Sequence, residues 1–348
     1  MPLLEFSEKG IFCRAAGVYI DPWRPVERAL ITHGHADHSR WGHRSYLCTE
    51  TARPVIRHRL GDVNIQSVKF GEQLEINGVD FSFHPAGHIP GSAQIRVAHK
   101  GEVWVVSGDY KLENDGLSEP FEPVRCHTFI TESTFGLPVF RWKKQEDVFG
   151  EINEWWRANK AEGKMSILAG YALGKAQRLL RGLDSSIGAI FTHGAIESTN
   201  QVIRKQGIPL PKTRRASTNV LKRDYTGAMA IVPPSALGTP WMRQFPPASI
   251  GLASGWMAMS STRHRRAADR GFVLSDHADW DGLNEAITLS GAERVIVTHG
   301  YTAIFRRYLE EERGIEAYEA HTEFEDELSE MNKGGDSGEE GKGNTKKP

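Results

Sequence analysis

The chain has 348 residues, of which 39% are hydrophobic and 25% charged, a composition that supports folded domains and argues against global disorder. Its formal net charge of −1 excludes a uniformly basic nucleic-acid coat. Three cysteines without paired spacing exclude a disulfide scaffold and a cysteine-type zinc finger, and neither a signal peptide nor an apolar run of membrane-spanning length is present. We therefore expect a soluble enzyme-sized chain from a reducing compartment such as the cytoplasm, without a membrane partner.

Short apolar runs predict strands, and each of them ends at polar residues of the kind used in catalysis. These runs cover residues 29–31, 103–106, 129–130, 272–274 and 295–297. Helical patterns lie between them, over residues 145–160, 175–183, 200–206, 282–290 and 303–313. This alternation predicts an α/β protein in which the loops at strand ends carry the chemistry.

Charge and proline content set the middle and the end of the chain apart. Residues 200–226 hold seven Lys and Arg against one acidic residue, and a second basic cluster follows at 263–270. Such clusters either neutralise nucleic-acid phosphates or are solvated surface. Proline-rich breaks mark residues 140–261 as a candidate inserted domain. Residues 310–340 hold thirteen acidic and two basic residues, and the polar end of the chain predicts a disordered tail.

The strongest local motif is His33-x-His35-x-Asp37-His38, which follows the first of the catalytic-type strands. Four such side chains within six residues can surround one or two divalent ions, and the mixture of imidazole and carboxylate suits zinc, manganese or iron. One loop cannot complete two coordination shells. The further candidates each follow a strand-like run, and they are His88, Asp109 and His299.

In this order, the residues resemble the metallo-β-lactamase superfamily signature. The later segments beginning at Thr131-Glu132, Tyr171 and Ser275-Asp276-His277 are similar to motifs of its β-CASP branch, the nucleases that cut nucleic acids. The resemblance covers the chain to about Tyr318, and the strings around Lys175 and His277 resemble the bacterial ligase-associated DNA exonucleases.

The resemblance implies a four-layer αββα fold with an inserted α/β β-CASP domain. We expect the metallo-β-lactamase domain at residues 1–138 and 262–328, the inserted domain at 139–261 and the tail at 329–348. One ion, expected to be Zn²⁺ with Mn²⁺ as the alternative, would be held by His33, His35 and His88. The second would be held by Asp37, His38 and His299, with Asp109 between the two.

The implied reaction is phosphodiester hydrolysis, in which two metals activate a hydroxide and clamp the phosphate. The expected catalytic residues are His277, Glu132 and Asp37. His277 would be the general acid because imidazole titrates near neutrality, and the resemblance implies that Glu132 hydrogen-bonds it. Asp276 and Asp279 are expected to support their loop, and Asp21 to lie behind the metal ligands.

Phosphate contacts are expected from Lys175, at a helix start, and from Ser260, Ser261, Thr262 and Arg263, whose hydroxyls and guanidinium could surround a 5′-phosphate. His193 also lies in a Thr-His-Gly string, for which we favour a structural role.

The leading hypothesis is a DNA exonuclease of DNA repair acting on single strands or duplex ends, with a DNA ligase and a helicase as functional partners by resemblance. The alternatives are an RNA exo- or endonuclease, a small-molecule hydrolase and a catalytically silent scaffold.

Overall fold

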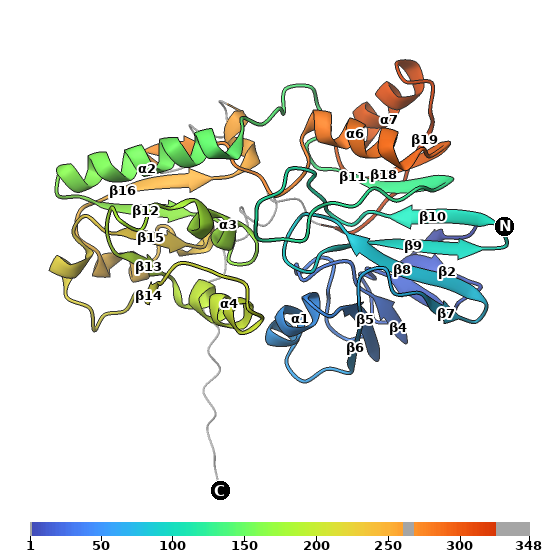
Figure 1. Ribbon diagram of the computed structural model, residues 1–348, viewed down its shortest axis with the longest axis horizontal. Helices are drawn as coiled ribbons and strands as arrows, with labels where there is room; N and C mark the ends of the chain where they lie inside the picture. The colour runs from blue at the N-terminus through green and yellow to red at the C-terminus, as the bar shows by residue number, and fades with distance from the viewer. Residues whose placement is uncertain (1, 260–267, 325–348) are drawn as a thin grey trace, which may run out of the picture.

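The computed structural model describes residues 2–259 and 268–324, which form two lobes side by side (Figure 1). The first lobe contains two sheets, and the first of them has six strands in chain order. These strands are β1 (Glu5–Ser7), β2 (Gly10–Cys13), β3 (Val18–Ile20), β4 (Arg28–Leu30), β5 (Ser45–Thr49) and β6 (Ile65–Val68). Helix α1 (Ala52–Leu60) packs on this sheet through Ile56 and Leu60, which join the buried cluster of Ala29 and Tyr46.

The second sheet has seven strands in the order β19-β18-β11-β10-β9-β8-β7. Their bounds are β7 (Leu74–Ile76), β8 (Val79–Pro85), β9 (Ala93–His99), β10 (Glu102–Val106), β11 (Thr128–Ser133), β18 (Arg294–Gly300) and β19 (Glu316–Glu319). Helices α6 (Trp280–Ser290) and α7 (Thr302–Glu311) cover one face through a buried cluster that includes Leu283, Phe305 and Leu309. The largest apolar cluster joins the two sheets and includes Ile11 and Val18 from one and Phe81 and Val97 from the other. Alternating apolar residues on these strands thus face a shared core.

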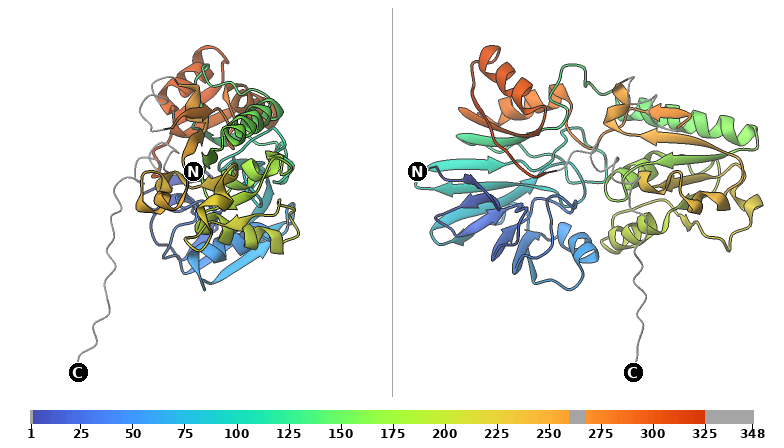
Figure 2. Two further views of the ribbon diagram at one scale, coloured as in Figure 1. Left: turned by 90° about the vertical axis from the view of Figure 1, so that its left-hand side faces the viewer. Right: turned by 180° about the vertical axis from the view of Figure 1, so that it is seen from behind.

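The second lobe is built on a parallel sheet with strand order β14-β13-β15-β12-β16-β17. Its strands are β12 (Met165–Ala169), β13 (Ile190–Thr192), β14 (Arg214–Arg215), β15 (Met229–Val232), β16 (Ala248–Ala253) and β17 (Arg270–Phe272). Its helices are α2 (Gln145–Ala161), α3 (Lys175–Gly182) and α4 (Gly194–Lys205), with short 3₁₀ turns η1 (Lys222–Tyr225), η2 (Pro234–Ala236), η3 (Pro240–Gln244) and η4 (Gly255–Ala258). The right-hand view in Figure 2 shows this lobe as a layered body beside the first. Buried runs such as that of β12 fit a parallel sheet with covered faces.

The mixed α/β character and the five expected helices are confirmed, with ends that differ by a few residues. The largest difference is α4, which begins at Gly194 rather than at residue 200, because the His193 side chain accepts a hydrogen bond from Ala195 N and caps the helix. The expected domain bounds, with the end of the insert at residue 261, stay a prediction. Strand β17 pairs in parallel with β16, so the third sheet reaches Phe272. Among the described residues, we find no helix with the length and apolar character that a membrane crossing needs.

Candidate metal centre

The candidate ligands gather at one edge of the two sheets of the first lobe because of strand direction. Strands β10, β11 and β18 are parallel neighbours, so Asp109, Glu132 and His299 lie at or just beyond adjacent carboxyl ends. Strand β8 runs in the same direction, since both it and β10 are antiparallel to β9, and it delivers His88 to this edge. The loop after β4 brings His33 to the same place.

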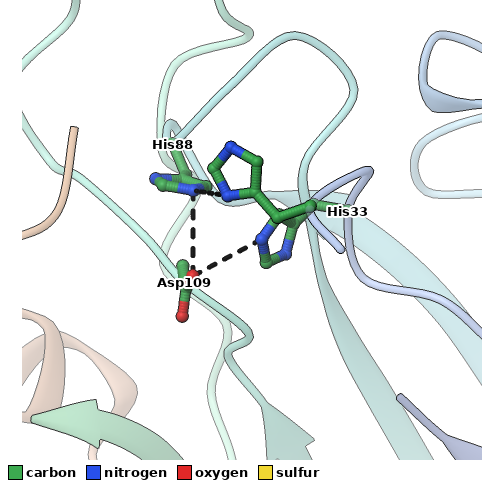
Figure 3. A group of neighbouring side chains, drawn as sticks. His33, His88 and Asp109 are labelled. Atoms are coloured by element: carbon green, nitrogen blue, oxygen red, sulfur yellow. Dashed lines mark hydrogen bonds and ion pairs between the residues drawn. The ribbon is translucent and has the colours of Figure 1, made fainter. Parts of the chain in front are cut away.

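Four residues form the tightest group. One ligand atom each from His33, His35, His88 and Asp109 lies within 4.8 Å of the others. The Asp109 Oδ2 atom is 3.4 Å from His33 Nε2 and 3.8 Å from His88 Nε2, and Figure 3 shows both rings turned toward this carboxylate. His35 Nδ1 lies 3.1 Å from His88 Nε2. Three imidazoles and a carboxylate converge here.

A second group of side chains also contacts Asp109. His299 Nε2 is 3.3 Å from Asp109 Oδ1, and His38 Nε2 is 3.6 Å from Asp109 Oδ2. Asp37 Oδ2 is 3.3 Å from the same His38 nitrogen. Asp109 therefore contacts both groups.

The approach of the loop that carries Asp109 to the loop that carries His33 depends on a glycine after β10. Gly108 has a φ of +56°, and a Cβ atom there would lie 2.7 Å from the Thr32 side chain. A larger residue would push Asp109 away from the first motif.

The imidazoles that face the group are oriented through their second nitrogen. This arrangement fixes the ring tautomer and leaves the inward nitrogen with its lone pair. The orienting pairs are His33 Nδ1 with Thr32 Oγ1 at 3.0 Å, His38 Nδ1 with Asp21 Oδ2 at 2.7 Å, His88 Nδ1 with the Asp276 carbonyl at 2.9 Å, and His35 Nε2 with the Leu173 carbonyl at 3.2 Å.

The donor set fits divalent metal. Within the described chain, His33 Nε2, His38 Nε2 and Asp109 Oδ1 are buried and have no hydrogen-bond partner. Buried polar atoms are normally paired, so converging lone pairs of this kind indicate a cation as their partner. Imidazole and carboxylate ligands without thiolate suit zinc or manganese.

Two histidines of the first group, His35 and His88, are held neutral. Burial lowers the pKa of His88 well below its ordinary value, and the neighbouring His277 adds to the effect. Burial, followed by the charge of His33, lowers the pKa of His35 to about 4. Neutral imidazole is the form that binds metal.

The carboxylates are held ionised. Burial raises the pKa of Asp109, but the charges of His38 and His277 outweigh it and leave the pKa well below its ordinary value. Burial lowers the pKa of His38, yet Asp37 and Asp109 hold it well above the ordinary value. The carboxylates around His38 thus favour a positive charge at this position, which a bound cation would supply in place of the ring proton.

A third group pairs an acid with a histidine beside Asp109. His277 Nδ1 lies 2.9 Å from Glu132 Oε2, and the other Glu132 oxygen accepts a hydrogen bond from Tyr110 N at 2.8 Å. Ligand atoms of Glu132, His277 and Asp109 lie within 4.8 Å of one another. The structure thus brings together the two side chains expected to interact, and their roles stay a prediction.

The second lobe contributes directly to the support of this centre. The Leu173 carbonyl that orients His35 precedes Gly174, which has a φ of +83° and whose added Cβ would lie 2.3 Å from Ile89. The Lys175 ammonium is fully buried, ion-paired with the Asp276 carboxylate, and donates to the Leu274 carbonyl at 3.2 Å. Lys175 thus supports the loop of His277 instead of facing solvent, and the phosphate contact expected of it stays a prediction.

Other expected residues have clear places. Asp21 lies behind His38, and Asp279 caps α6 by accepting from Gly282 N at 2.9 Å. His193 caps α4, which fits its expected structural role. The expected phosphate pocket, Ser260, Ser261, Thr262 and Arg263, lies outside the described residues.

Several contacts at the site are not visible in the sequence. Arg178 is 1% exposed and donates to the Ser275 carbonyl at 2.8 Å, and the Leu173 carbonyl acts through its backbone, which leaves no residue-type signal. Phe324 stacks on the His38 ring with centroids 4.3 Å apart. The only hint of these contacts in the sequence is that Arg178 lies three residues after Lys175, in the helix that follows the glycine turn.

Comparison with known proteins finds relatives that include nucleases. No family model matches it. A probable DNA ligase of Opitutus terrae is 30% identical over 319 residues, which are 90% of this chain and 31% of that protein. Ribonuclease TTHA0252 of Thermus thermophilus is 26% identical over 205 residues, or 50% of this chain and 44% of the relative. Cleavage and polyadenylation specificity factor 73 of Drosophila melanogaster is 29% identical over 122 residues, or 34% and 18%. The chain thus spans less than half the length of each of these relatives.

A solved structure supports the fold alone. A protein of unknown function from Enterococcus faecalis matches with a TM-score of 0.58 at 11% identity, over 80% of this chain and 76% of that one. The His and Asp motifs, the strand ends that gather them and the curated relatives all agree with the resemblance of this chain to the β-CASP branch of the metallo-β-lactamase superfamily.

Proposed function

We propose that the chain is a metal-dependent phosphodiesterase that degrades DNA from an end. The observation that carries the proposal is the placement of His277, on Glu132, directly beside the Asp109 carboxylate shared by two histidine groups. A nuclease needs charge neutralisation at the phosphate and a proton for the leaving oxygen, and this arrangement offers both within one buried cluster.

In this proposal His33, His35 and His88 hold one divalent ion, expected to be Zn²⁺, and Asp37, His38 and His299 hold the second. Asp109 lies between them. Ions bound there would neutralise phosphate charge and lower the pKa of a water molecule. The proposal also gives the first lobe the four-layer sandwich of the family. Its two sheets would be the inner layers, with α1 on one side and α6 and α7 on the other.

The chain's own residues supply the proton step. Glu132 accepts from His277 Nδ1, which orients the ring and favours its protonated form. His277 Nε2 is then the atom that donates a proton to the leaving oxygen of the cut strand. Tyr110 N holds the other oxygen of Glu132, so the carboxylate cannot rotate away from the ring.

DNA as the substrate is supported by the relative named as a probable DNA ligase, whose matched part is 31% of its length. A nuclease joined or functionally linked to a ligase, with a helicase as a further partner, would prepare ends for sealing. The three thiols of Cys13, Cys48 and Cys126 are buried and free, which supports a reducing compartment such as the cytoplasm.

The second candidate is an RNA nuclease. The names of several relatives favour it, among them ribonuclease TTHA0252 and the endoribonuclease YSH1 of Yarrowia lipolytica, which is 31% identical over 124 residues. A small-molecule hydrolase would need neither the second lobe nor the pair of His277 and Glu132.

The test uses end-labelled DNA and RNA of one sequence, with and without a 5′-phosphate, and protein loaded with Zn²⁺ or Mn²⁺. We expect stepwise shortening of DNA, and a loss of about 10³-fold or more in His277→Ala and Asp109→Ala. His193→Ala is the matched control, because this histidine caps a helix of the second lobe. Cleavage of RNA alone would move the assignment to the second candidate, and no cleavage of either strand by metal-loaded protein would overturn the proposal.

A further inference from the structure

The chain that follows β19 turns back to the metal centre and is held there by two arginines. The Glu323 carboxylate accepts hydrogen bonds from Arg24 Nη1 and Nη2, each at 2.6 Å, in a two-pronged arrangement. Arg40 Nη2 donates to the Glu323 carbonyl at 2.5 Å, and Arg40 Nη1 lies 3.9 Å from the carboxylate. Two guanidinium groups thus converge on one acidic residue.

The next residue covers the side of the centre formed by the second group. The Phe324 ring lies flat on His38, with centroids 4.3 Å apart and planes 16° from parallel. Its edge faces His299 at 5.7 Å, and Trp23 meets it at 5.7 Å in a perpendicular arrangement. The His38 side chain is 1% exposed beneath this cover.

Together, Glu323 and Phe324 present the two recognition features of a nucleotide. A guanidinium fork that binds a carboxylate through two hydrogen bonds binds a phosphate in the same geometry. Aromatic rings are the surfaces on which nucleobases stack. The Glu323 carboxylate thus occupies a position that would suit a phosphate, and the Phe324 ring a position that would suit a base, next to the expected metal ligand His38.

We propose that Arg24, Arg40 and the face of His38 form a nucleotide subsite at the metal centre, which Glu323 and Phe324 fill in the free protein. This inference rests on the proposed nucleic-acid substrate and adds where one of its nucleotides binds. An open cavity lined by residues 6–9, Trp23 and Arg24 borders the segment and gives the neighbouring nucleotide a place.

The segment is held in a way that a substrate can displace. The Arg24 and Glu323 side chains are 54% and 43% exposed, and ion pairs of such exposure contribute little to stability. Glu323 carries the same sign of charge as a nucleic-acid phosphate, so the two would compete for the same guanidinium groups. A strongly negative ligand such as a nucleic acid would thus displace Glu323 from the subsite, whereas a weakly charged ligand would not.

The test measures binding of a fluorescein-labelled phosphorothioate oligodeoxynucleotide to the metal-loaded full chain by anisotropy. The combined substitution Glu323→Gln with Phe324→Ala should tighten binding by about tenfold, because a bound base can then stack on the face of His38 that the phenyl ring no longer covers. Glu323→Gln alone keeps the ring and should tighten binding by about threefold, on the same scale. Adding Arg24→Gln to the combined variant should reverse the gain.

Glu27→Gln is the matched control, because it removes an exposed carboxylate paired with Arg44 at the opposite end of β4 from His33. Unchanged or weaker binding by the two Glu323 variants, with wild-type circular dichroism and melting temperature, would overturn the subsite.

Hydrolysis of an unmodified strand by the same proteins separates the two proposals. Cleavage with unchanged affinity in the Glu323 variants overturns the subsite alone. Tighter binding without cleavage by any protein overturns the nuclease and keeps the subsite, and no binding by any protein overturns both.

Discussion

Two buried polar clusters lie close together in this protein, and they differ in where their partners come from. Around Asp109, inward atoms of His33 and His38 have no hydrogen-bond partner within the described chain. At the junction of the lobes, Lys175 pairs with Asp276, while the terminal nitrogens of Arg178 reach Ser275 O and Gln145 Oε1 at 2.8 and 2.9 Å.

The difference separates a binding site from a structural support. Burying an ionisable group is costly unless it is paired, so a cluster whose charges are paired within the chain needs no ligand, although Arg178 Nε is left without a hydrogen-bond partner there among the described residues. A cluster whose lone pairs converge on one point is complete only when a cation binds. Burial and charge density alone would have made the two clusters look alike.

The largest effect is expected when the metal is removed from the cluster around Asp109. Protein saturated with Zn²⁺ at about a thousand times its dissociation constant should be about 4 kcal/mol more stable than chelator-treated protein. Asp109→Asn should lose most of this difference, because it removes the carboxylate that contacts both groups. Thermal unfolding with and without chelator, beside metal content by mass spectrometry, gives the comparison.

Asp80→Asn is the control for charge removal, since Asp80 is an exposed residue of β8. Equal melting temperatures for metal-loaded and chelated wild type would contradict the metal interpretation of this cluster.

The next effect breaks the second cluster. Lys175→Met should cost about 3 kcal/mol in free energy of unfolding, because it leaves the Asp276 carboxylate buried without its partner. Denaturant unfolding measures the loss, and Lys175→Met with Asp276→Asn should recover most of it. If the single variant is as stable as wild type, the junction cluster is not the support described here.

The smallest effect is expected for Glu197, a carboxylate of the second lobe whose charge is hydrogen-bonded within the chain. Burial raises the pKa of Glu197, but hydrogen bonds from Thr192, Thr213 and Arg204 outweigh it and lower the pKa below its ordinary 4.5. A depressed carboxyl pKa stabilises the fold above the unfolded value, and this stability is lost as pH falls through the folded value.

Glu197→Gln should therefore cost about 1–2 kcal/mol at pH 7, with a difference from wild type that shrinks as pH falls below 4.5. Urea unfolding at several pH values tests this, with Glu146→Gln on α2 as an exposed control. A cost that grows toward acid pH would reverse the expected sign.

Much of the candidate site can be predicted from the sequence. His33 to His38, Asp109 and His299 each follow or end an apolar strand, and ligand chemistry belongs to the residue types themselves. The contact of Glu132 with His277 spans 145 positions, and only family resemblance leads one to expect it. The apolar run at residues 272–274 predicts a strand at the position of β17, but no local pattern shows that this strand pairs with β16, so its place in the third sheet is visible only in the structure.

The sequence by itself determined which residue types could hold a metal, because imidazoles and carboxylates are ligands that divalent metals prefer. Only the tertiary structure decided which charges are satisfied. Lys175 could have faced a phosphate as well as Asp276, and Phe324 could have faced solvent as well as His38. Their partners depend on strand order and on the way the second lobe and the chain after β19 return to the site, which no local pattern encodes.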